Sequence, residues 1–184
     1  MRLSPLPAAA LMALAVACGS SSLSRSTAEK LIKPDYPAVA PVRVPRTATV
    51  EKGSAKFSEL QAIHAVLQKD GGVAIQAKEE GAKVTYTYAL TSKASQAAKT
   101  TPAGFQLPAA DVEFQRIQTV ETRGNQARAT YEVRLARPTG LFPAFQLIHP
   151  GAKIGQTKVR HAEFDKQGGK WGLLKTDEKL ETKE

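Results

Sequence analysis

The sequence predicts an α+β fold, with helices in the N-terminal part followed by an antiparallel sheet of about four strands. Two patterns lead to this prediction. Apolar residues recur at helical spacing between residues 56 and 69, where Phe57, Leu60 and Leu67 fall on one face. Between residues 126 and 137, apolar and polar residues alternate instead, as in a strand with one buried face.

Composition and charge limit the classes of protein to consider. The 184 residues are 42% hydrophobic and 23% charged, which is typical of one globular domain or two very small ones. The formal net charge of +9 favours acidic partners such as anionic lipids, nucleic acid or acidic polysaccharide. The basic residues are spread along the chain, so a surface that serves only solubility remains an alternative.

The first seventeen residues have the composition of a secretion signal. Arg2 precedes an apolar stretch from Ala8 to Ala17, which is too short for a stable membrane span. We therefore expect residues 1–17 to be a signal peptide. An exported protein does not meet the chromosome, so nucleic acid is the least favoured of the acidic partners.

The junction Ala15-Val16-Ala17-Cys18 resembles the lipobox of bacterial lipoproteins, and the chain as a whole is similar to predicted bacterial lipoproteins. The resemblance implies cleavage before Cys18, a diacylglyceryl thioether on its sulfur, and a fatty acyl group such as palmitate on its amine. Gly19 follows, in place of the aspartate that would suggest inner-membrane retention. The resemblance thus implies a lipid-anchored envelope protein, on the periplasmic face of the outer membrane if the cell has two membranes.

Residues 18–40 are predicted to form a tether and a short helix. Small polar residues follow Cys18, the only cysteine, so a lipidated chain would have no free thiol and no internal disulfide. Ser26 and Glu29 match a capping box for a helix over about residues 26–33, which should stop before Pro34. A proline-containing arm comes next, and residues 42–50 could end as a strand.

Residues 41–99 are expected to form a subdomain of one helix and a hairpin. The helix over residues 56–69 should end at Gly71-Gly72, and strands over 73–78 and 83–90 should pair. This order, followed by Tyr88-Ala-Leu-Thr-Ser-Lys93, resembles the end of a winged-helix domain. The resemblance concerns the fold alone, and no DNA-contacting residue is transferred from it.

Residues 105–176 are expected to form the antiparallel β subdomain, after a linker over residues 100–106. Two long strands, over 110–121 and 126–137, should meet at a turn over residues 123–125, with a β-bulge near Gln115-Arg116 where the first strand changes phase. A last hairpin over 157–165 and 170–174 should turn at Gly168-Gly169, and residues 177–184 form a charged tail.

Residues 138–150 interrupt the strand pattern with an apolar loop or short helix. The segment from Leu141 to Phe145 should be buried at one end of a sheet. If it were exposed, it would instead be a docking patch for a partner or a membrane.

Residues with catalytic or metal-binding chemistry form no recognisable motif. His64 should be a packed histidine with one hydrogen bond, and His149 and His161 lack the spacing of a metal-ligand pair. Asp111 and Glu113 share a strand face, which is far commoner for solvated residues than for a glycosidase pair. Neither a Gly-x-Ser-x-Gly elbow nor a Ser-x-x-Lys pair occurs.

The sequence therefore predicts a non-catalytic binding or assembly module of the cell envelope. We expect lipid at Cys18 to attach the protein to a membrane, and an envelope protein or an anionic surface is a further expected partner. No catalytic residue, cofactor or metal is assigned. The alternative is an envelope hydrolase whose active site is assembled from residues far apart in the sequence.

Overall fold

The computed structural model describes residues 22–177 of the protein, and Cys18 lies outside the described residues. Strands make up 53% of this part and helices 22%. The predicted α+β class is therefore wrong, because the structure is mostly β, with a curled larger sheet, a second sheet of three strands and only three short α-helices. The expected order of helices first and strands afterwards also fails, since strands run through the whole described chain.

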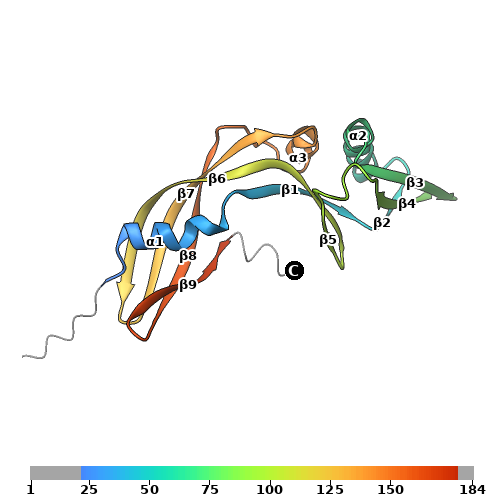
Figure 1. Cartoon of the computed structure of the whole chain (residues 1–184). Helices are drawn as coiled ribbons and strands as arrows, with labels where there is room; N and C mark the ends of the chain where they lie inside the picture. Colours follow the sequence, from blue (N-terminus) through green and yellow to red (C-terminus); the bar gives the residue numbers. More distant parts are fainter. Residues whose placement is uncertain (1–21, 178–184) are drawn as a thin grey trace, which may run out of the picture.

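The larger sheet is antiparallel and curls into a half-barrel (Figure 1). Its strands lie in the order β1-β6-β7-β8-β9, and a short β5 also pairs with β6. Their bounds are β1 Ala38–Pro45, β5 Lys99–Thr101, β6 Gly104–Arg123, β7 Gln126–Pro138, β8 Thr157–Gln167 and β9 Lys170–Thr176. β1 thus joins the larger sheet although the arm that contains it precedes the helix and hairpin in sequence.

The long β6–β7 hairpin is the centre of this sheet, as its alternating sequence predicts. Five alternate residues of β7 are buried, namely Ala127, Ala129, Tyr131, Val133 and Leu135. The pairing with β7 shifts between Phe114 and Arg116, which confirms the predicted bulge. The linker expected over residues 100–106 is wrong, because β5 and the start of β6 pair there.

The first helix, α1 (Arg25–Ile32), packs against β6 and β9 and is followed by a 3-10 turn, Lys33–Asp35. Ser24, rather than the expected Ser26, is the N-cap: its hydroxyl oxygen accepts a hydrogen bond of 3.1 Å from the amide of Thr27. Ala28 and Ile32 are fully buried. The helix therefore covers part of the larger sheet.

The smaller sheet has the order β2-β4-β3 and is covered by the longest helix, α2 (Figure 1). Their bounds are β2 Thr47–Glu51, α2 Ala55–Asp70, β3 Val73–Glu80 and β4 Lys83–Leu90. Gly71 ends α2 with a left-handed conformation, φ +74°, as glycine at this position favours. The helix and hairpin are confirmed, but one helix on a three-stranded sheet is not a winged-helix domain.

The third helix, α3 (Phe142–Ile148), lies between β7 and β8 in sequence and contacts α2, β1 and β6. Leu141, Phe142 and Phe145 are buried, which confirms the expected burial of this segment. Leu147 and Ile148 are exposed, at 49% and 40%. The helix therefore closes one end of the larger sheet and leaves apolar side chains at the surface.

Candidate functional site

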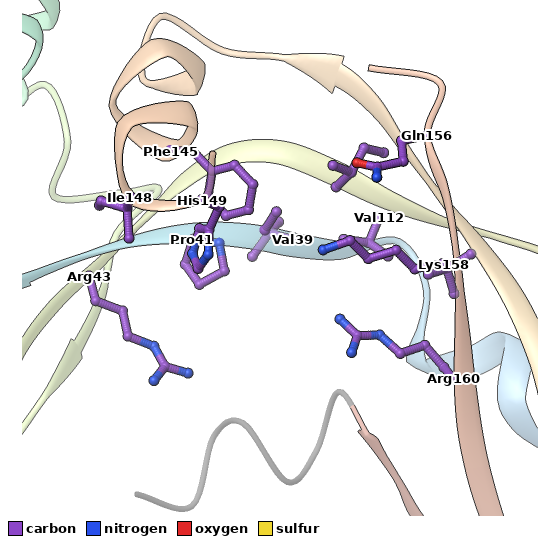
Figure 2. A pocket seen from close by; sticks show the side chains of 13 residues that line it. Val39, Pro41, Arg43, Val112, Phe145, Ile148, His149, Gln156, Lys158 and Arg160 are labelled. Carbon is purple, nitrogen blue, oxygen red and sulfur yellow. The ribbon is translucent and has the colours of Figure 1, made fainter. Parts of the chain in front are cut away.

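A groove of about 640 Å³ lies on the larger sheet. This volume lies within the range of roughly 300–1,000 Å³ that is usual for small-molecule sites. Its walls come from β1, β6, β7, the start of β8, and α3 (Figure 2). The lining residues are Val39, Ala40, Pro41, Arg43, Val112, Val133, Leu135, Phe145, Ile148, His149, Gln156, Lys158 and Arg160.

Apolar side chains form the floor of this groove. Val112 on β6 and Val133 and Leu135 on β7 are between 3% and 7% exposed. Phe145 from α3 is buried, whereas Ile148 on the same helix and Val39 on β1 remain 40% and 48% exposed. A ligand in the groove would therefore cover apolar surface that is otherwise in contact with water.

Cationic side chains form the rim. Among the described lining residues, Arg43, Lys158 and Arg160 are basic and none is acidic. Figure 2 shows the Arg43 side chain from β1 and the Arg160 side chain from β8 extending toward one another across the opening. The rim should thus attract anions, and it should do so most strongly at low ionic strength.

Strand pairing fixes where these residues lie. Lys158 is the register partner of Val133, and Arg160 is the partner of Tyr131, so the two cations flank the β7 part of the floor. The chain before β8 is held against β7 by a hydrogen bond of 2.8 Å from the amide of Gly155 to the carbonyl of Leu135. β1 reaches the groove from the other edge, through its pairing with β6.

His149 is the histidine of this groove. Its ring lies 4.4 Å from that of Phe145, and its side chain is exposed at the end of α3. His161 lies on β8, where its backbone amide donates a 2.8 Å hydrogen bond to the carboxylate of Asp177. The three histidines are therefore not gathered into one site, and no cluster of His, Cys, Asp or Glu within residues 22–177 is arranged to hold a metal ion.

His64 is a packed histidine, as predicted. It is 5% exposed, and its Nε2 atom lies 2.8 Å from the hydroxyl oxygen of Tyr88. Its ring also lies 4.5 Å from the ring of Tyr86, in an edge-on contact. Burial lowers the pKa of His64 below 6.5, while burial and the neighbouring Tyr86 raise the pKa of Tyr88 to about 12. Both side chains are thus neutral at pH 7 and act as core residues of the smaller sheet.

Asp111 and Glu113 are paired with arginines rather than with a reaction site. Arg137 Nε lies 2.5 Å from Asp111 Oδ2, and an Arg137 nitrogen lies 3.1 Å from Glu113 Oε1. Arg134 contacts the same Glu113 at 3.0 Å. These acids belong to an ion-pair network on the exposed face of the β6–β7 hairpin.

A second cavity of about 350 Å³ lies at the other end of the sheet, near the β6–β7 turn. It is lined by residues of both charges and by few apolar ones, with Glu121, Glu163 and Asp165 beside Arg123 and Arg128. This mixture offers a ligand neither an apolar floor nor a single charge. The groove is the better candidate for a binding site.

No local pattern in the sequence indicates the groove. Arg43 and Lys158 are separated by more than a hundred positions in the sequence, and the fold brings both to the lining of one groove. The one local signal in this region is the apolar segment before His149: its residues Leu141, Phe142 and Phe145 are buried as expected, and Ile148, which follows them, is exposed.

The described helices include none long and apolar enough to cross a membrane. Comparison with known proteins found no matching family model, no similar curated protein and no similar solved structure.

Proposed function

We propose that this protein is a non-catalytic binding module of the cell envelope, anchored by lipid at Cys18, with the basic groove as its ligand site. The observation that carries the proposal is the composition of the groove, which combines a buried apolar floor with three basic residues at the rim. A few charged groups around a mostly apolar cavity are typical of a binding site for a small molecule.

The position of Leu23, close to the N-terminal end of the described residues, supports the proposed lipid anchor at Cys18. The amide of Leu23 donates a hydrogen bond of 3.2 Å to the hydroxyl of Thr122, close to the β6–β7 turn, and Leu23 is 4% exposed. Leu23 lies five positions after Cys18, so the tether can reach at most about 18 Å when fully extended. Lipid at Cys18 would hold this end of the sheet near the membrane surface.

The anchor is tested on the protein purified from the membranes of a bacterium that carries lipoproteins. Mass spectrometry of the mature N-terminus should show an acylated Cys18, and Cys18→Ser should release the protein from the membrane fraction. An unmodified N-terminus at any other residue would contradict the anchor. Several acyl chains bind a membrane firmly, so partial release by salt would also contradict it.

The groove is tested with an anionic aromatic dye such as anilinonaphthalene sulfonate, using the mature chain with Cys18→Ser. We expect saturable binding that Lys158→Glu weakens and Lys170→Glu does not. Both lysines are exposed and lie on strands of the same sheet, but only Lys158 lines the groove. Equal loss in both variants, or in neither, would contradict the assignment of the groove as the site.

The same chain also tests the alternative of an envelope hydrolase. His149 is the histidine that lines the groove, so it is the general base that such an enzyme would be expected to use. Turnover in a screen of ester, amide and glycoside substrates, abolished by His149→Gln and kept in His161→Gln, would contradict the proposal of a non-catalytic module.

A further inference from the structure

We infer that the ligand of the groove is a single fatty acid, with its carboxylate head at the basic rim and its acyl chain on the apolar floor. This inference rests on the proposed function, because it names the ligand class of the same groove.

The apolar lining indicates a ligand with a hydrocarbon part. Aliphatic side chains come from three strands and from α3, and Ile148 and Val39 are exposed although they are large and apolar. Phe145 and Pro41 add further apolar surface between them. Covering such surface is favourable because it removes apolar side chains from contact with water.

The charges indicate an anionic head. Arg43, Lys158 and Arg160 are the charged residues of the described lining, and all three have the same sign. A guanidinium group presents two parallel N–H donors, which match the two oxygens of a carboxylate. Arg43 and Arg160 take part in further interactions within the protein. The head would share or exchange those contacts, so Lys158 is the cleaner position to change.

The two arginines lie apart from the α3 side of the groove, as the head and the chain of an amphiphile require. In Figure 2 the side chains of Arg43 and Arg160 point toward one another from opposite sides of the groove, whereas Phe145, Ile148 and His149 lie toward α3. A head between the two arginines would leave the chain directed toward α3. None of the described lining residues carries a hydroxyl group, so a hydroxyl substituent along the acyl chain would find no hydroxyl partner on the floor.

The size of the groove favours one chain with a small head. Its volume of about 640 Å³ lies in the middle of the range for small-molecule sites and is shared between the opening and the floor. A carboxylate head is small and leaves most of that volume to the acyl chain. The glycerol and phosphate of a lysophospholipid would occupy much of the volume that the chain needs. A whole membrane lipid with two chains fits this space less well still.

Calorimetric titration of the mature chain, residues 18–184 with Cys18→Ser, tests the inference below the micelle concentration of each ligand. Dodecanoate should bind at one site. Dodecanol, which has the same chain without the charge, and butyrate, which has the charge without the chain, should each bind about tenfold or more weakly. Affinity for dodecanoate should fall as the salt concentration rises.

Two pairs of variants locate head and chain separately. Lys158→Gln should weaken dodecanoate binding several-fold and leave dodecanol unchanged, with Lys170→Gln as its matched control. Ile148→Asn should weaken both ligands, and Ile154→Asn is its control, because Ile154 is exposed to the same degree, 42% against 40%, and lies outside the groove. A circular dichroism spectrum and a melting curve confirm that each variant is folded.

The outcomes separate this inference from the proposed function. If binding of the dye depends on Lys158 but dodecanoate binds no better than butyrate, the groove is an anion site, and the inference that it binds an acyl chain is wrong. Equal binding of dodecanol would overturn the role of the charge, and tighter binding of lysophosphatidylglycerol would overturn the carboxylate head. If neither dye nor dodecanoate binds, the proposed function itself fails.

Discussion

The Nε2 atom of His64 and the hydroxyl oxygen of Tyr88 lie 2.8 Å apart, and both side chains are about 95% buried. The pair joins α2 to β4 across the core of the smaller sheet. Tyr86 extends the contact, because its ring packs on His64 and its hydroxyl oxygen lies 2.8 Å from the side-chain nitrogen of Gln61. The polar groups of these side chains thus have hydrogen-bond partners inside the core of the smaller sheet. Their ionisation is linked to the stability of that core.

Acid should destabilise the protein through His64. Burial lowers the pKa of His64 in the folded state below 6.5, so the unfolded chain takes up a proton first as the pH falls. The contribution of His64 to the free energy of unfolding should therefore be largest above pH 6.5 and should decrease as the pH falls below that value. Urea melts between pH 7.5 and 5 measure this slope.

The control for this prediction is His161, which is exposed. His64→Phe, which cannot be protonated, should flatten the slope, whereas His161→Gln should keep it. An unchanged slope in His64→Phe would show that another group controls stability in this pH range.

Alkali should destabilise the same core through Tyr88. Its pKa in the folded state is raised to about 12 from a usual value of 10, so the unfolded chain loses the phenolic proton first. Stability should fall as the pH rises from about 10 to about 12. Tyr88→Phe should remove part of this fall, which urea melts between pH 10 and pH 12 measure. At pH 8 the same variant should be less stable by about 1 kcal/mol, because it lacks the hydrogen bond to His64.

The strands of the larger sheet could be predicted where their own sequence alternates, and could not where their pairing is distant. β7 was predicted almost residue for residue, since Tyr131 and Val133 lie on its buried face. β1 contains Pro41 and Pro45, which suggested an extended arm with a strand only toward its end, over residues 42–50. Both prolines are tolerated because β1 is the edge strand, where one row of backbone donors has no partner strand.

The groove could not be predicted for the same reason. Its floor belongs to β6 and β7, but its rim comes from β1 and β8, whose distance is set by the curl of the sheet. Local periodicity indicates which side of a strand is buried, and it contains no information on how far a sheet curls. Nothing in the sequence therefore distinguishes Arg43 and Lys158 from the other basic residues, which are spread along the chain.

The buried face of β7 should control the stability of the larger sheet. Tyr131 is fully buried and Val133 is 3% exposed, whereas the Arg128 and Arg134 side chains are 63% and 46% exposed. Tyr131→Ala should lower the free energy of unfolding by about 3–5 kcal/mol, and Val133→Ala by about 1.5–3 kcal/mol. Arg128→Ala and Arg134→Ala should each cost less than about 1 kcal/mol. The reverse order in denaturant melts would mean that the register of β7 is wrong.

Gly104 should tolerate no side chain. Its φ is +154°, and a Cβ atom there would lie 2.1 Å from the carbonyl oxygen of Val44 on β1. Gly104→Ala should therefore separate the ends of β1 and β6 and lower the free energy of unfolding by at least about 2 kcal/mol. Gly172→Ala is the control, because its Cβ would meet its nearest neighbour at 3.5 Å, an ordinary contact. Similar melts for the two variants would contradict the close approach of β1 and β6.

Basic residues at the end of the sheet nearest the proposed lipid anchor should add to membrane attachment. Arg123 lies at the β6–β7 turn, and Lys170 begins β9 after the β8–β9 turn; both are exposed. A basic residue close to an anionic membrane contributes about 1 kcal/mol. Arg123→Gln together with Lys170→Gln should therefore weaken binding of the lipid-free mature chain to anionic vesicles by about tenfold or more at low salt.

The matched control removes the same charge from the other end of the molecule. Lys56→Gln together with Lys69→Gln changes two exposed lysines of α2, which lies far from the β6–β7 turn (Figure 1). Vesicle sedimentation should give nearly unchanged binding for this pair. If both pairs weaken binding equally, the attraction depends on net charge alone, and the hairpin turns do not face the membrane. Equal binding of the unaltered chain to neutral and anionic vesicles would remove the electrostatic contribution altogether.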